Sequence, residues 1–210
     1  MTSPQKQNVV VVGGGISGVT VAQGLSKKLD HSKYNLILIE SRPHHIWLPA
    51  TVRMVVTSDE KFVETVTFPF DKVFAKGKGT VRQDKVVSIK EGNGEDPSTL
   101  ELASGETLQY RGEPITSVCL LFRVSYSDAF FAPALVLATG SKWSGPIDLP
   151  DSDADLRQFV AQWREKFRAA TDVVIVGGGA VGLELSGEVR DEYPVRCSID
   201  VPRLETHISV

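Results

Sequence analysis

Apolar residues near the start of the chain follow two different periods. Residues 8–12, NVVVV, are apolar almost throughout, which predicts a short strand buried on both faces. Residues 16–30 have apolar positions at helical spacing, and a second apolar run, YNLILIE, follows at residues 34–40. The predicted helix places Ala22, Leu25 and Leu29 on one face. The pattern therefore predicts strand, helix and strand, the opening of an α/β fold.

The same order returns near the end of the chain. Residues 172–176, DVVIV, predict a strand, and residues 180–193 predict a helix with apolar positions at i, i+4 and i+8. These positions are Val181, Leu185 and Val189. Between the two copies, residues 134–141, ALVLATGS, predict a further buried strand, and residues 156–170 predict an amphipathic helix. The apolar face of that helix consists of Leu156, Phe159, Val160, Trp163 and Phe167.

The first strand runs into a turn with the spacing G-x-G-x-x-G. Gly13 makes the tight turn, Gly15 lets a pyrophosphate approach the backbone, and Gly18 lets the helix pack closely on the sheet. The N-terminus of the helix then presents N–H groups and a positive dipole end to the phosphates. Glu40 ends the second strand about 20 residues after the turn, where a carboxylate accepts ribose hydroxyls. The alternative is a ligand-free α/β fold in which Glu40 is a surface acid. We favour dinucleotide binding, because the strand, the glycine turn, the helix, the second strand and the acid all agree with it.

The second turn repeats this spacing at Gly177, Gly179 and Gly182. Glu184 follows it and has two interpretations, a surface acid favoured near a helix N-terminus or a contact to a nicotinamide nucleotide. The strand within residues 134–141 ends in Ala138-Thr139-Gly140, where the backbone turns sharply and a cofactor can lie against it.

Composition narrows the function classes. The chain has 210 residues and a formal net charge of -3, with no basic stripe, so we expect no nucleic-acid binding. No apolar run reaches the roughly 20 residues of a membrane span. Only eight residues precede Val9, the first apolar residue of the first strand, so we expect no signal peptide and a cytoplasmic location. The two cysteines, Cys119 and Cys197, form no metal-ligand spacing, and we expect no metal site.

The chain is similar to a known family over nearly all of its length up to Pro194, apart from one insertion, and two of its segments are the most specific. Residues 40–54, ESRPHHIWLPATVRM, and residues 188–194, EVRDEYP, resemble the apoptosis-inducing-factor-like NAD(P)H:quinone oxidoreductases, with the ferroptosis-suppressor type as the most similar branch. These belong to the pyridine nucleotide-disulfide oxidoreductase superfamily, in which FAD occupies the first Rossmann unit and NAD(P)H the second. The resemblance implies FAD-contacting positions at Gly13, Gly14, Gly15, Ile16, Ser17, Gly18, Glu40, Arg53, Val87, Thr139 and Gly140. It implies nicotinamide-nucleotide positions at Gly177, Gly179, Gly182 and Glu184.

The resemblance also predicts a domain organisation. Residues 1–145 would form a Rossmann-like FAD-binding domain, residues 146–170 a connector with the amphipathic helix, and residues 171–210 the start of an NAD(P)-binding unit that is apparently truncated. Residues 111–133 stand where the family has almost no sequence. They are a surface loop, a loop that contacts a membrane or a quinone, or, in the interpretation we favour, translated non-coding sequence.

The implied activity is electron transfer from NAD(P)H through FAD to a quinone or similar acceptor. The redox-active cysteine pair of the disulfide reductases is missing after the first turn, which excludes a dithiol relay and assigns the chemistry to the flavin. We interpret His44 and His45 as packing or surface residues rather than proton carriers. Peripheral contact with a membrane stays open, and the alternative function is a non-catalytic remnant that binds a nucleotide weakly or not at all.

Overall fold

The computed structural model describes residues 6–74, 77–93, 96–111, 114–116 and 135–194. The chain divides into two compact units. Unit 1 consists of Met1–His45 and Phe68–Ser141, and unit 2 consists of Ile46–Thr67 and Lys142–Val210. These units are defined by how the residues pack, whereas the boundaries predicted near residues 145 and 170 separate the parts expected to bind different cofactors. Those boundaries stay predictions.

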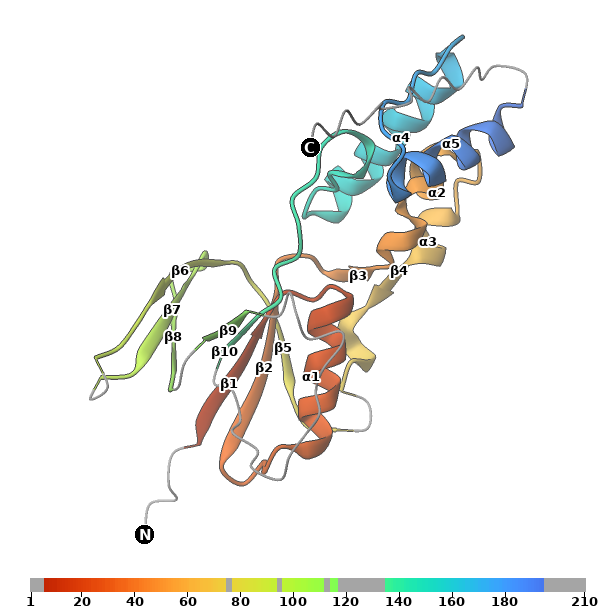
Figure 1. The fold of residues 1–210 in the computed structure, drawn as a ribbon. Coiled ribbons are helices and arrows are strands. Elements are labelled where there is room, and N and C mark those ends of the chain that lie inside the picture. Colours follow the sequence, from red (N-terminus) through yellow and green to blue (C-terminus); the bar gives the residue numbers. More distant parts are fainter. Residues whose placement is uncertain (1–5, 75–76, 94–95, 112–113, 117–134, 195–210) are drawn as a thin grey trace, which may run out of the picture. The chain divides into compact units, whose positions relative to one another are not determined.

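Unit 1 is built on a five-stranded sheet in the order β5-β2-β1-β10-β9, shown in Figure 1. Every neighbouring pair in this sheet is parallel. The strands are β1 (Gln7–Val12), β2 (Tyr34–Glu40), β5 (Thr80–Gln83), β9 (Pro114–Thr116) and β10 (Leu135–Leu137). The predicted strands at residues 8–12 and 34–40 are therefore confirmed, as are a strand within residues 134–141 and the α/β fold class.

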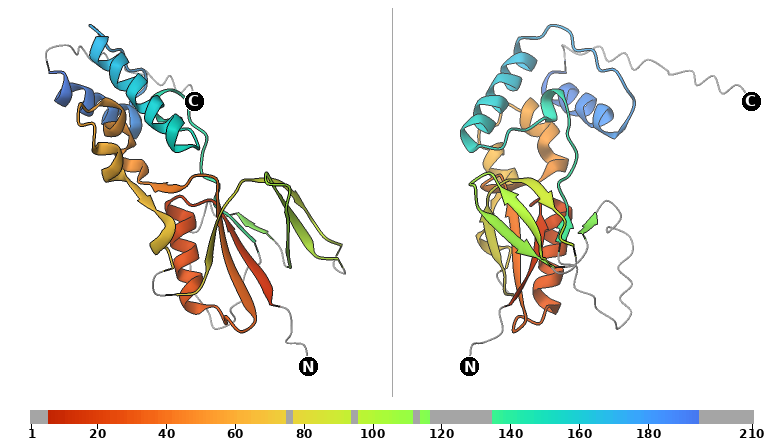
Figure 2. Two further views of the ribbon diagram at one scale, coloured as in Figure 1. Left: turned by 180° about the vertical axis from the view of Figure 1, so that it is seen from behind. Right: turned by 90° about the vertical axis from the view of Figure 1, so that its left-hand side faces the viewer.

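The two faces of this sheet are covered by different layers, which the views of Figures 1 and 2 show alike. Helix α1 (Ile16–Lys28) covers one face, where its predicted apolar residues pack with Val9 and Val11 of β1. A three-stranded antiparallel sheet covers the other face, where Val10 and Val12 pack. Because β1 is buried on both sides, its sequence is a continuous apolar run instead of an alternating one.

The three-stranded sheet is formed by β6 (Val86–Lys90), β7 (Ser98–Leu102) and β8 (Thr107–Tyr110). The strand that precedes β6 in the chain belongs to the main sheet instead. Residues 80–83 join the main sheet as β5, in parallel to β2, because Val81 packs in the same core as α1. Within the segment 111–133, residues 114–116 form β9 at the edge of the main sheet, and residues 112–113 and 117–133 lie outside the described residues.

Unit 2 is mainly helical, and its three longest helices share one apolar core. These are α2 (Thr51–Val56), α4 (Asp153–Ala169) and α5 (Ala180–Glu192), and shorter elements are α3 (Phe62–Val66), η1 (Leu48–Ala50) and η4 (Gly145–Ile147). Leu156, Val160 and Phe167 of α4 are buried in this core, as the amphipathic pattern predicted. Ser152 caps α4 by accepting the N–H of Asp155 at 3.1 Å. Strands β3 (His44–Ile46) and β4 (Thr67–Pro69) pair where the chain leaves unit 1 and returns to it, and η2 (Phe70–Lys72) follows β4.

The strand predicted at residues 172–176 is not formed. These residues have no ladder partner in the described parts of the chain, and an extended segment becomes a strand only through hydrogen bonds to a neighbour. Ile175 is buried, but Val174 and Val176 are 71% and 81% exposed. Residues 195–210 lie outside the described part.

Candidate functional site

The first glycine turn is shaped by close backbone contacts. Gly13 has φ = 105°, and a Cβ atom there would lie 2.2 Å from the carbonyl oxygen of Ala138. A Cβ at Gly18 would lie 1.7 Å from the carbonyl oxygen of Gly13. Both distances are far below van der Waals contact, so the packing of β1, α1 and β10 itself requires these two glycines. The roles predicted for Gly13 and Gly18 thus have a physical basis within the protein.

Gly15 is different, because nothing in the protein explains it. Its backbone is extended, with φ = -69° and ψ = -176°, and, apart from its neighbours in the chain, no atom of the described residues lies within 4 Å of the position where a Cβ would stand. Gly15 begins α1 without a side-chain cap, and the first turn of the helix, with Ile16 and Ser17, contains no acidic residue. The first N–H groups of a helix have no partner within the helix. An open space with free donors and a positive dipole end favours an anionic group.

Glu40 lies beside this turn at the end of β2. Its carboxylate accepts the backbone N–H of Gly14, and it also accepts the N–H of Arg42 at 3.0 Å and the hydroxyl of Ser41 at 3.2 Å. A carboxylate has about four acceptor positions, so this arrangement leaves capacity for a ligand hydroxyl, and the Ser41 hydroxyl is free to rotate away. Glu40 therefore braces the turn in addition to the ribose contact that the sequence predicts for it.

His45 also contacts this turn. Its Nδ1 atom lies 2.8 Å from the carbonyl oxygen of Gly14. The imidazole ring contacts the rings of Phe68 and Phe70, each with centroids 6.4 Å away. A Cβ at Gly14 would lie 2.6 Å from Cζ of Phe70, so the phenyl ring also fixes the space around that glycine. The sequence predicted only packing or the surface for His45 and gave no sign of this contact, because nothing local links a histidine to a turn 31 residues earlier.

Residues Thr139 and Gly140 lie at the end of the strand next to this turn. β10 pairs with β1, the N–H of Ala138 donates to the carbonyl of Val12 at 2.8 Å, and both Thr139 and Gly140 are exposed. The carboxyl ends of β1, β2 and β10 thus bring together the glycine turn, Glu40 and Thr139-Gly140. The chain adds strands on opposite sides of β1 at this point, which is where ligands bind in open α/β sheets.

Arg53 and Val87 belong to other elements than this group. Arg53 belongs to α2 in unit 2, where its guanidinium pairs with Asp191 at 3.1 Å and with Glu188 at 3.5 Å, both on α5. Val87 belongs to β6 in the three-stranded sheet, and its side chain is exposed. Their FAD contacts stay predictions based on family resemblance.

The second glycine turn repeats the geometry of the first within unit 2. Gly177 has φ = 113°, and a Cβ at Gly182 would lie 2.2 Å from the Gly177 carbonyl oxygen. Gly179 begins α5 with an extended backbone and no side-chain cap, and among the residues that the structure describes only its chain neighbours come within 4 Å of its Cβ position. Glu184 is exposed on α5. The second turn therefore has the same open face and free donors as the first, although no strand pairs with residues 172–176 in the described chain.

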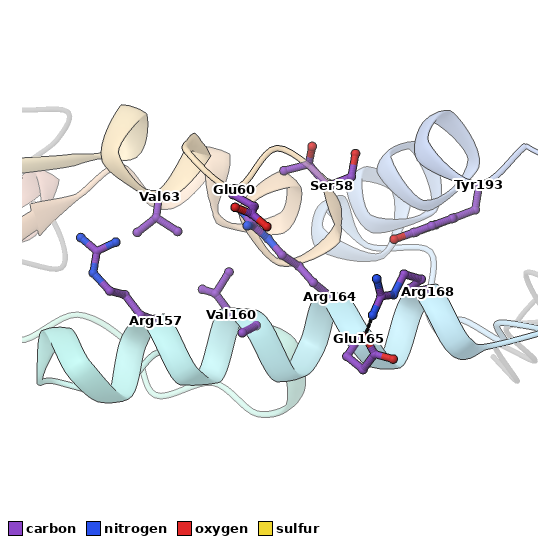
Figure 3. Close-up of a pocket in the computed structure, with 11 residues that line it drawn as sticks. Ser58, Glu60, Val63, Arg157, Val160, Arg164, Glu165, Arg168 and Tyr193 are labelled. Atoms are coloured by element: carbon purple, nitrogen blue, oxygen red, sulfur yellow. Dashed lines mark hydrogen bonds and ion pairs between the residues drawn. The ribbon is translucent and has the colours of Figure 1, made fainter.

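Unit 2 also contains a pocket of about 380 Å³ beside α4, shown in Figure 3. Arg157, Arg164 and Arg168 line it from the helix, and Arg164 extends toward Glu60. The Nε atom of Arg164 donates to the carbonyl of Met54 at 3.0 Å, while its buried Nη2 has no hydrogen-bond partner among the described residues. Burial lowers the pKa of Arg164, and four nearby carboxylates, among them Glu60, oppose that shift. The charge of Arg164 is therefore compensated by carboxylates of the protein itself. None of the predicted cofactor residues lines the pocket.

The fold and the two matching turns define a class, α/β proteins with two turns of the dinucleotide-binding type. The chain belongs to the pyridine nucleotide-disulphide oxidoreductase family, which matches residues 7–193. Members of this family are FAD-dependent enzymes that use NAD(P)H.

Individual relatives agree with this assignment. FAD-dependent oxidoreductase FVFD30 of Flammulina velutipes is 37% identical over 141 residues, covering 67% of this chain and 37% of that protein. Apoptosis-inducing factor homolog B of Dictyostelium discoideum is 29% identical over 204 residues, covering 94% and 42%. Ferroptosis suppressor protein 1 of Mus musculus is 27% identical over 191 residues, covering 89% and 41%. The resemblance to this branch of the family is confirmed, and the chain spans less than half the length of each of these relatives.

The fold agrees with solved structures as well. NADH:rubredoxin oxidoreductase from Clostridium acetobutylicum superposes with a TM-score of 0.58 at 17% identity, over 94% of this chain and 45% of that one. At this identity the likeness concerns the fold alone. Within the part of the chain that the structure describes, no helix combines the length and the apolar character needed to cross a membrane.

Proposed function

We propose that this chain binds FAD at its first glycine turn and forms the FAD-binding part of an oxidoreductase that takes electrons from NAD(P)H. The observation that carries the proposal is the open face at Gly15. The packing of the described residues does not require a glycine at this position. Gly15 lies beside the free N–H donors at the start of α1, and Glu40 contacts the same turn. A Cβ there would occupy the space where a pyrophosphate must touch the backbone.

The residues present fit the adenosine diphosphate half of FAD. The N–H groups of Gly15, Ile16 and Ser17 would hold the pyrophosphate, and Glu40 would accept ribose hydroxyls. The exposed backbone of Thr139 and Gly140 would lie along the same ligand. When bound, the flavin supplies the redox chemistry, since it accepts a hydride and passes electrons on. The residues of this chain bind and orient the cofactor.

For the electron donor, support comes from the second turn. Gly177, Gly179 and Gly182 have the geometry of the first turn, and the free donors at the start of α5 suit a second pyrophosphate. We assign this turn, with Glu184 as a further contact, to NAD(P)H. For the acceptor, the resemblance to the ferroptosis-suppressor type supports a quinone or a similar compound.

The proposal is tested by measuring FAD binding to the purified chain. We expect a yellow protein with a flavin absorbance spectrum, and we expect Gly15→Val to lose FAD while keeping its far-UV circular dichroism. Gly24→Val is the matched control, because Gly24 also lies on α1, away from the turn, and no described residue outside its own helix lies within 4 Å of its Cβ position. Stoichiometric flavin in the Gly15→Val protein would contradict the assignment.

Adding NADH separates the proposed activity from simple nucleotide binding. Bleaching of the bound flavin under anaerobic conditions supports an oxidoreductase. A yellow protein whose flavin does not bleach supports the alternative, a nucleotide-binding chain without catalysis. A soluble quinone that restores the oxidised spectrum would identify the class of acceptor.

A further inference from the structure

We infer that His45 is a positioning residue for the phosphate-binding turn and that it acts through the carbonyl group of Gly14. The inference rests on the proposed FAD binding and extends it to a residue outside the glycine motif. It starts from the 2.8 Å distance between Nδ1 of His45 and the Gly14 carbonyl oxygen.

Because of the peptide geometry, the contact between His45 and the Gly14 carbonyl also sets the direction of the Gly15 N–H. In a trans peptide the C=O and the following N–H lie in one plane and point in opposite directions. When His45 holds the Gly14 carbonyl on its side, the N–H of Gly15 points away from His45. That N–H belongs to the residue whose Cβ position faces open space, where the pyrophosphate is proposed to lie.

The turn needs such an anchor because of its composition. Gly13, Gly14 and Gly15 are consecutive, and glycine has more backbone freedom to lose than any other residue. Glu40 holds the N–H of Gly14 and His45 holds its carbonyl, so one glycine is fixed at both of its polar groups. Fixing the turn before the ligand arrives lowers the entropy lost on binding.

The surroundings keep the imidazole in place. Phe70 lies edge-on to the ring at an interplanar angle of 77°, and Phe68 lies tilted at 36°. Phe70 is itself buried in the core between α1 and the sheet, so it links the histidine to the rigid part of unit 1. Because a carbonyl oxygen only accepts hydrogen bonds, the contact requires the proton to be on Nδ1.

Three variants separate positioning from packing. His45→Phe keeps an aromatic ring between Phe68 and Phe70 but removes the donor, and we expect the Kd for FAD to rise about tenfold. His45→Asn places its amide nitrogen near the position of Nδ1, and we expect a Kd within about threefold of the original protein. His44→Phe introduces the same ring at the adjacent position, which points to the other side of β3, and should leave the Kd unchanged.

Equal FAD affinity of the original and His45→Phe proteins, or a loss in His45→Asn as large as in His45→Phe, would overturn the inference. A second measurement needs no FAD. The ¹⁵N NMR spectrum of the ligand-free protein at pH 8 should show the Nδ1–H tautomer of His45, and the Nε2–H tautomer would overturn the inference. If the original protein fails to bind FAD, the proposed function is wrong, while the tautomer still decides whether His45 holds the turn.

Discussion

At the scale of single residues, the glycines of one motif have two separate physical origins. Gly13 and Gly18 are demanded by backbone atoms of the protein that lie 2.2 Å and 1.7 Å from their Cβ positions. Gly15 has open space around it and an ordinary backbone conformation. Substitution of the first two should therefore damage the fold, whereas substitution of Gly15 should damage ligand binding alone.

Glu40 offers a test of the adenosine contact. In Glu40→Gln the charge is lost while a side-chain oxygen remains to accept the N–H of Gly14. Hydrogen bonds to a charged group contribute about 1.5–3 kcal/mol, so we expect FAD to bind roughly 10- to 150-fold more weakly. The measurement is a fluorescence titration with FAD. Glu91→Gln removes a charge from an exposed site and serves as the control, and an unchanged Kd in Glu40→Gln would remove this residue from the site.

At the scale of elements, Asp84, which lies outside the glycine motif, connects the two sheets of unit 1 through hydrogen bonds. Asp84 follows β5, and its carboxylate accepts the hydroxyl of Ser104 at 2.6 Å and the N–H of Lys85 at 2.8 Å. These hydrogen bonds lower the pKa of Asp84, and the bond from the Ser104 hydroxyl has the largest effect. Its own N–H donates to the carbonyl of Glu40 at 3.0 Å, so the same residue touches the end of β2. Asp84 thus ties the β7–β8 turn to the edge of the parallel sheet.

This anchor predicts a pH dependence of stability. A folded pKa below the unfolded value of about 3.9 means that the carboxylate stabilises the fold fully above about pH 5. The stabilisation is lost as the pH falls through the lower, folded pKa. Asp84→Asn should therefore lower the Tm at pH 7, and the difference from the original protein should shrink below about pH 4. Thermal unfolding from pH 3 to pH 8 measures this, with the exposed Asp71→Asn as the control. A Tm difference that stays constant down to pH 3 would contradict the role of the charge.

At the scale of the whole molecule, the two turns have similar backbone geometry, but among the described residues only the first is packed against a neighbouring strand. The first turn leads from β1, which is paired on both sides, into α1. The second follows residues 172–176, which have no paired strand in the described chain and expose Val174 and Val176. Because the matched part is less than half of each of these relatives, the proposed activity of the family concerns a larger protein than this chain of 210 residues.

We therefore expect this chain by itself to oxidise NADH slowly. Hydride transfer depends on fixed geometry between the two cofactors, and a displacement of about 1 Å costs about 100-fold in rate. With equal amounts of bound FAD, the rate of NADH oxidation with a soluble quinone should be at least about 100-fold below that of a full-length relative. Comparable rates would show that these 210 residues are sufficient for catalysis.

Sequence by itself determined the features that depend on local chemistry. The apolar run of β1, the helical period of α1 and α4, and the glycine spacing predicted where strands, helices and both turns lie, because propensity, period and sterics act between residues close in sequence. Glu40 was placed correctly beside the first turn because the length of one βαβ unit fixes that distance.

Only the tertiary structure decided how distant residues combine. It showed that Gly14 is held between Glu40 and His45, that residues 80–83 join the parallel sheet, and that residues 172–176 do not form a strand. Each of these outcomes depends on a hydrogen-bond partner that lies far away in the chain. A strand exists only beside another strand, and a histidine orients a turn only where the fold brings the two together.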